Sequence, residues 1–307
     1  MFRAVTKNVG RVAKTVVGVA AGTTVSIVAS EWAIERKRLA GADSKIQPIL
    51  QNQKEAICLG ELVNNSYAEK AVPVENYVPF TSEEYKKYGL IQNDGNGFKM
   101  DVYHTPDGNL AVAFRGSLTD MSNKEAWHNW FPTNFNNGFA VWGDTSEVKL
   151  AIEMTGILLK INPEGNLLAL GHSMGANLAM RCVIAHDTPR MTSKGFNPSG
   201  VNTRLLYDLY PGKSAAQIDK IIAEKFSSRM VNYIDPKDGV YLANRLSGMF
   251  CGPEILLGEM NPIRIRYFKF VEALQRHAMD SMMKKMPRDE KAIEASKNFS
   301  SGEKEQA

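Results

Sequence analysis

A serine stands between two glycines where an apolar stretch of the chain gives way to a helical one. The residues Gly-His-Ser-Met-Gly occupy positions 171–175, after the apolar run 167–170 and before the helix-like stretch 176–186. This is the context of a nucleophile elbow, in which a strand, a sharp turn and a helix expose a serine. Glycines on both sides let neighbouring backbone approach, and the helix start offers free N–H groups to an oxyanion. The pattern predicts that Ser173 is a nucleophile.

A serine hydroxyl is a poor nucleophile until a base takes its proton. The chain has five histidines. In enzymes with a nucleophile elbow, the acid and then the histidine follow the serine along the chain. His186 lies at the far end of the elbow helix, and the one later histidine is His277. The order of residues therefore predicts His277 as the base, whereas His128 precedes the serine and is expected to be structural.

The acid that orients the histidine is expected near the end of a strand after the elbow. Residues 229–234 have a strand pattern, and Asp-Pro-Lys-Asp-Gly-Val follows at 235–240. Asp235 ends the strand beside a proline that suits a turn, and Asp238 lies further into the loop, before a glycine. The residue types alone leave both aspartates as candidates.

An acyl transfer also needs donors for the oxyanion. One donor is normally the N–H of the residue after the nucleophile, here Met174. The second comes from a loop after an earlier strand, and the apolar residues 110–114 run into Arg-Gly-Ser at 115–117. Because Gly116 frees the backbone, we expect the N–H or hydroxyl of Ser117 to point at the substrate.

Four segments, taken in order, resemble the class 3 lipase family, and more narrowly its bacterial lipase-like group of α/β-hydrolases. They are Ala-Phe-Arg-Gly-Ser at 113–117, the elbow at 171–175, Asp-Gly-Val at 238–240 and His-Ala-Met at 277–279. The resemblance implies hydrolysis of lipid carboxylic esters without a metal or cofactor. The family's Asp-x-Val pattern falls on Asp238, which implies this residue as the acid and leaves Asp235 as the alternative. Ser117 stands where threonine is common in the family.

Strand and helix patterns alternate through most of the chain and predict an α/β fold. We expect an α/β-hydrolase three-layer sandwich, with a mostly parallel sheet and helices on both faces. Helices are predicted at 48–67, 148–161, 176–186 and 218–226, and strands at 110–114, 167–170, 193–196 and 229–234. Turn residues at 93–97 and 105–109 predict hairpins, the first between 88–91 and 98–104. The catalytic domain is expected to span 45–285, after a targeting or membrane segment at 1–40 and before a disordered polar tail at 286–307.

The composition excludes several classes of protein. A chain of 307 residues with 44% apolar residues is ordinary for a globular enzyme. The net charge of +4 fits a weak attraction to anionic membranes but is no signature of nucleic-acid binding. The three cysteines lie far apart, so neither a disulfide framework nor a zinc site is expected, and Cys182 is predicted to be a core residue.

An aromatic segment at 121–142 follows the predicted oxyanion loop directly. It holds three of the four tryptophans together with several asparagines that suit a loop. Trp127, Trp130 and Phe131 either form an apolar flap that covers the acyl pocket and touches lipid, or they cover the core. The sequence favours neither interpretation.

The first residues of the chain are basic and then apolar. Four cationic residues precede the run 16–29, and no acidic residue comes before Glu31. The pattern fits a secretory signal cleaved near residues 28–30, a short membrane helix, or an amphipathic presequence. We expect a secreted or membrane-associated protein, with a cytoplasmic location left open.

These features predict a serine esterase that acts on lipid esters and meets a membrane surface. The same triad also serves an acyltransferase, which passes the acyl group to an alcohol. An interaction protein at a membrane, with a vestigial hydrolase core, is the alternative from another class.

Overall fold

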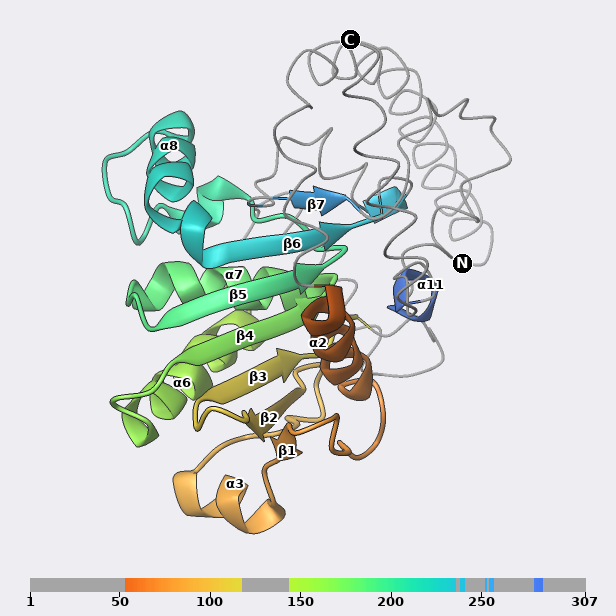
Figure 1. The fold of residues 1–307 in the computed structure, drawn as a ribbon. Helices are drawn as coiled ribbons and strands as arrows, with labels where there is room; N and C mark the ends of the chain where they lie inside the picture. Colours follow the sequence, from red (N-terminus) through yellow and green to blue (C-terminus); the bar gives the residue numbers. More distant parts are fainter. Residues whose placement is uncertain are drawn as a thin grey trace, which may run out of the picture. The chain divides into compact units, whose positions relative to one another are not determined.

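Seven strands, each beside its neighbours in the sequence, form one sheet in the computed structural model (Figure 1). The structure describes residues 53–117, 144–235, 238–240, 252, 254–256 and 279–283. The strands are β1 (Val78–Pro79), β2 (Met100–His104), β3 (Leu110–Phe114), β4 (Leu167–His172), β5 (Met191–Phe196), β6 (Met230–Ile234) and β7 (Glu254–Leu256). β1 to β3 pair antiparallel, whereas β3 to β7 are all parallel. The carboxyl ends of five parallel strands therefore meet at one edge.

Helices cover both faces of this sheet. They are α2 (Gln53–Asn65), α3 (Ser82–Tyr88), α6 (Ser146–Ile161), α7 (Met174–His186), α8 (Ala215–Phe226) and α11 (Met279–Met283). Short 3-10 turns stand at Thr203–Leu206 and Ser227–Arg229. α6 packs on α7, which rests on β4 and β5, while α2 contacts β3 and β4 on the opposite face (Figure 1). Parallel strands in sequential order place their right-handed crossover helices on one face, as seen for α6 and α7.

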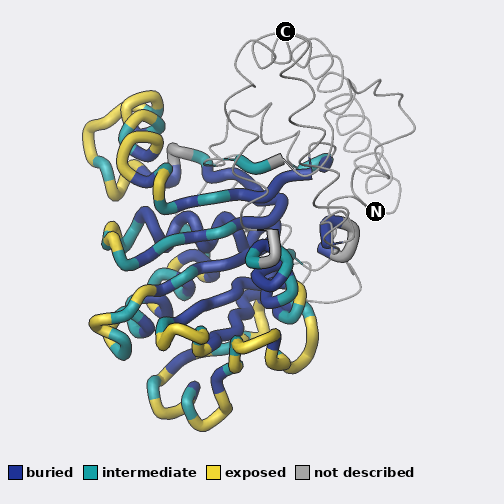
Figure 2. Tube along the Cα trace, viewed as in Figure 1, coloured by how far each residue is buried: buried dark blue, intermediate teal, exposed yellow. Residues whose placement is uncertain are grey.

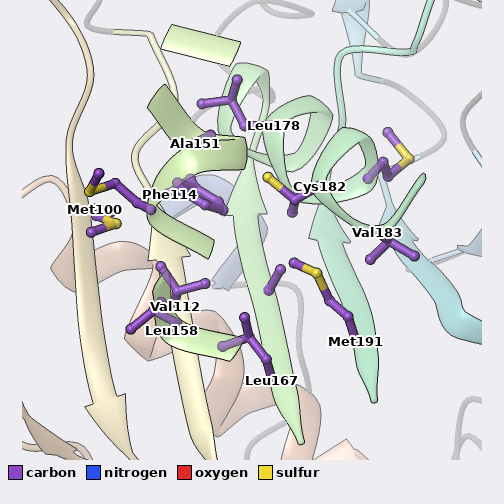
Figure 3. Close-up of a cluster of buried hydrophobic side chains, with 14 of the residues drawn as sticks. Met100, Val112, Phe114, Ala151, Leu158, Leu167, Leu178, Cys182, Val183 and Met191 are labelled. Atoms are coloured by element: carbon purple, nitrogen blue, oxygen red, sulfur yellow. The ribbon is translucent and has the colours of Figure 1, made fainter. Parts of the chain in front are cut away.

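The alternation of side chains along the strands divides the core into two clusters. Val112 and Phe114 face α6 and α7, in the cluster shown in Figure 3. Ala111 and Ala113 face the opposite way, toward α2 and α11. Strands β3, β4 and β6 are buried along almost their whole length, and exposed residues gather in the turns and on the outer helices (Figure 2). Burial on both faces is typical of parallel strands.

The second cluster joins two helices that are far apart in the sequence. α11 packs against α2, and Met279, Met282 and Met283 are buried there. A Cβ on Gly60 of α2 would lie 2.5 Å from the sulfur of Met283, so the glycine leaves room for that side chain.

The predicted α/β fold, with a mostly parallel sheet and helices on both faces, is confirmed. Apart from the strand at 88–91, the strands and helices predicted between residues 48 and 234 lie within a few residues of their predicted places, and the turn at 105–109 joins β2 to β3 as expected. The helix predicted from residue 48 is described from Gln53 to Asn65.

The prediction of a strand at 88–91 is wrong. Tyr88 ends helix α3, and the expected hairpin is reduced to one isolated bridge between Asn93 and Lys99. The helix has a complete capping box, in which Thr81 and Glu84 bond each other's backbone, and Gly89 ends it in the left-handed conformation. The hydrogen bonds of these two caps stabilise a helix in this segment, whereas the apolar pattern that predicted a strand is weak.

Several predicted segments lie outside the described residues. They include the N-terminal segment 1–40, the whole aromatic segment at 121–142, and the tail at 286–307. Within the described part of the chain, no helix is long and apolar enough to cross a membrane.

Candidate active site

Ser173 occupies a strained turn between β4 and α7. Its backbone angles are φ 54° and ψ −121°, in a region that residues other than glycine rarely adopt. The turn is fixed from both sides, because the Ser173 N–H donates to the Phe196 carbonyl at 3.1 Å and its own carbonyl accepts from the Ser199 N–H at 3.0 Å. The predicted elbow geometry, with strand, sharp turn and helix, is therefore present at this serine.

The two glycines of the elbow are required by close backbone contacts. A Cβ on Gly171 would come within 3.0 Å of the Gly175 backbone, and a Cβ on Gly175 would come equally close to the Phe114 backbone. Backbone atoms cannot give way as a flexible side chain can. Both glycines thus let neighbouring backbone approach, as predicted, and Gly175 lets the start of α7 lie against the end of β3.

The strain at Ser173 leads to a prediction about stability. Ser173→Gly is expected to be more stable than Ser173→Ala by about 1 kcal/mol, because glycine adopts this conformation at little cost and the relief exceeds its larger unfolded-state entropy. In a protein of this size, that difference raises the melting temperature by about 2 °C or more. Differential scanning fluorimetry on both variants measures it, and equal melting temperatures would show that the backbone at residue 173 carries no strain.

The two predicted oxyanion donors come from residues in contact. Ser117 follows β3, and its hydroxyl donates to the sulfur of Met174 at 3.6 Å. Met174 is the first residue of α7, so its N–H belongs to the helix start, where donors have no partner within the helix. The register that pairs Phe114 with Gly171 brings the two loops together at the carboxyl edge.

Both candidate acids lie at the same edge, after β6. Asp235 is 2% exposed and Asp238 is 0% exposed. The Asp238 N–H donates to the Asp235 carbonyl at 2.9 Å, which closes a tight turn. The Asp235 N–H donates to the side-chain oxygen of Asn197 at 2.7 Å. Hydrogen bonds thus connect Asn197, which follows β5 near the elbow, to Asp235, and Asp235 to Asp238. These bonds do not show which of the two aspartates is the acid.

The other predicted site residues lie outside the described residues. His277 is two positions before α11, and the flap residues Trp127, Trp130 and Phe131 belong to the aromatic segment. Their roles remain predictions. The described helix α11 is buried against α2 and therefore fixes the chain just after His277.

A tyrosine that the sequence did not single out lies beside the elbow. The Tyr67 hydroxyl is 2.7 Å from Nδ1 of His172, the residue before the nucleophile. The two residues are 105 positions apart, so no motif or local spacing pointed to this pair.

Two other polar groups of the elbow helix have structural roles. His186 shares a hydrogen bond of 2.8 Å with the Thr155 hydroxyl, and burial lowers its pKa. Cys182 is fully buried, as predicted, and burial raises the pKa of its thiol to about 12. Among the described residues, no three His, Cys, Asp or Glu side chains gather as metal ligands would.

No protein-family model matches the chain, and no curated protein does. Among solved structures, the chain is similar to a crystal structure of a mutant form of MDLA from Penicillium cyclopium. The sequence identity is 14% and the TM-score is 0.42, with 72% of this chain and 84% of that chain covered.

Proposed function

We propose that the protein is a serine hydrolase that cleaves carboxylic esters of lipids through an acyl-enzyme. The strained turn at Ser173 carries the proposal, because it holds a serine at the start of a helix, next to Met174, which contacts Ser117 in the loop after β3. Strain of this kind costs about 1 to 3 kcal/mol, persists only where the surrounding structure enforces it, and is common at active sites. The resemblance of the four motifs to lipases supports the lipid ester as substrate.

The proposed reaction uses the triad in two halves. The Ser173 hydroxyl oxygen attacks the acyl carbonyl carbon while His277 takes its proton, and the oxyanion is held by the donors at Ser117 and Met174. The ester bond then breaks, and His277 returns the proton to the leaving alcohol. Water repeats the attack on the acyl-enzyme and releases the fatty acid. Asp238 orients His277 and stabilises the imidazolium.

A fluorophosphonate probe tests the proposal directly. Such probes form a covalent bond with an activated serine, so we expect one label per chain, and peptide mapping should locate it at Ser173. A protein with a folded core but no label would instead be an interaction protein with a vestigial site. Acyl transfer to an added alcohol, without release of fatty acid, would favour the acyltransferase.

The aromatic segment provides a test of the lipid substrate. If Trp130 meets the membrane, Trp130→Ala should weaken turnover of lipid vesicles far more than turnover of a soluble short-chain ester. Burying one indole is worth roughly 2 kcal/mol or more. Titration of both activities against vesicle concentration measures the difference. Equal loss on both substrates, together with loss of folded protein, would assign these aromatic residues to the core.

The N-terminal segment is proposed to bring the enzyme to a membrane. Deletion of residues 1–40 should reduce recovery with membranes but leave turnover of the soluble ester nearly unchanged, because none of the proposed catalytic groups lies there. Fractionation of the full-length and shortened proteins compares the two.

A further inference from the structure

We infer that Tyr67 is a positioning residue, whose hydroxyl joins the loop after β3 to the strand that carries the nucleophile and so fixes the proposed oxyanion hole. This inference rests on the proposed serine hydrolase function. It concerns three residues that lie together at the carboxyl edge of the sheet, namely Tyr67, Gly116 and His172.

The Tyr67 hydroxyl lies between two backbone segments of the site. On one side it shares a hydrogen bond of 2.7 Å with Nδ1 of His172, and the two rings meet edge to face with centroids 5.9 Å apart. On the other side it lies against Gly116. A Cβ on Gly116 would come within 3.0 Å of the hydroxyl and 3.3 Å from Nδ1 of His172. Glycine thus leaves the space that the hydroxyl occupies.

The hydroxyl keeps its proton in this position. Burial raises the pKa of Tyr67 well above its ordinary value, and a hydrogen bond from the Gly116 backbone and the charge of Arg115 lower it only in part. The protonated hydroxyl therefore has a proton to donate to Nδ1 of His172. The imidazole of His172 then carries its own proton on Nε2.

The turn that carries Tyr67 is held by a buried lysine. The ammonium of Lys99 donates to the carbonyls of Ser66, at 3.0 Å, and Ala68, which flank Tyr67 on both sides. Lys99 is 4% exposed, and its own carbonyl accepts from the Arg115 N–H at 3.0 Å. Burying a charge is costly unless it is well bonded. This lysine therefore ties the Tyr67 turn to the start of the oxyanion loop.

Tyr67 thus connects the two segments that each supply one proposed donor. Gly116 precedes Ser117, and His172 lies two residues before Met174. If the hydroxyl sets the separation of these segments, its loss should misplace the donors relative to the oxyanion. Such a change lowers kcat more than it changes KM, because the oxyanion exists only after the attack.

Tyr67→Phe removes the hydroxyl and keeps the ring. With p-nitrophenyl butyrate, we expect kcat to fall about tenfold to a hundredfold while KM stays within about twofold. Tyr85→Phe is the matched control, since the buried Tyr85 hydroxyl also accepts from a backbone N–H, that of Val102 at 2.8 Å, but lies outside the site. Both variants should lose similar thermal stability, and only Tyr67→Phe should lose turnover.

Two substitutions at the partner keep the test decisive if Tyr67→Phe does not fold. His172→Asn keeps an acceptor at the δ position and should retain most of the turnover, whereas His172→Leu should lose it as Tyr67→Phe does. The double variant Tyr67→Phe/His172→Leu should turn over no more slowly than the slower single variant, because both substitutions remove the same hydrogen bond.

The outcomes separate this inference from the function on which it rests. If the wild-type protein does not react with a fluorophosphonate at Ser173, the serine hydrolase proposal fails, and the role of Tyr67 with it. If the wild type reacts and Tyr67→Phe has the same kcat and the same labelling rate, the role of Tyr67 alone is disproved. Equal loss in Tyr67→Phe and Tyr85→Phe would also disprove it.

Discussion

Replacing Ser173 with alanine is expected to remove ester hydrolysis almost completely while the fold is retained. The substitution deletes the attacking oxygen and leaves the backbone of the elbow as it is. Losses of about a millionfold in kcat are typical when the nucleophile or base of a triad is removed. Turnover of p-nitrophenyl butyrate checks the prediction, provided that enough enzyme is used to detect the small activity that remains. His277→Ala should cost about as much, because triad members act as a unit.

A matched control lies on the neighbouring strand. Ser193 of β5 is also buried, at 2% exposed, and its hydroxyl has no hydrogen-bond partner among the described residues. Ser193→Ala should therefore keep wild-type turnover. If Ser173→Ala retained more than about a tenth of the wild-type rate, nucleophilic catalysis at the elbow would be wrong, since binding and the oxyanion hole alone leave far less.

The largest effect outside the serine and histidine is expected at Asp238. Asp238→Asn should lower kcat by about ten-thousandfold, because an amide in place of the carboxylate favours the wrong tautomer of the histidine. The pH dependence of kcat, measured alongside, reports whether the base is still able to take a proton.

Asp235→Asn is the control, since the two residues share one turn and similar burial. It should cost mainly stability, on the order of 1 kcal/mol for a lost turn or cap interaction. The reverse pattern, with turnover lost at residue 235 and kept at 238, would assign the acid to Asp235.

The elements that carry strong local signals could be predicted from the sequence. The run before Ser173, the glycines at 171 and 175 and the small residue Ala176 indicated a strand, a tight turn and a closely packed helix. The structure adds the reason: a Cβ on Gly195 of β5 would lie 3.0 Å from the Cβ of Ala176. Local backbone chemistry determines such a segment, so its pattern can be recognised without the rest of the fold.

Two features could not be predicted in the same way. Helix α3 is short, and its signals are the capping pair Thr81 and Glu84 with Gly89 after it, which carry no apolar periodicity. The contact of Tyr67 with His172 depends on how α2 lies over the sheet, and nothing in either local sequence encodes it. The candidate acids show a related limit, because Asp235 and Asp238 share burial and backbone bonds, so only the motif distinguished them.

The packing of α11 on α2 bears on when the protein acquires its activity. α2 precedes every strand of the sheet, and α11 follows them all. A chain that folds during synthesis can form the sheet, the elbow and the segments of both proposed donors before residues 279–283 exist. Contacts between such distant segments also form late, because closing the intervening loop costs entropy. Because His277 is synthesised two residues before α11, the proposed mechanism implies that Ser173 has no base, and therefore no activity, until the end of this region has been made.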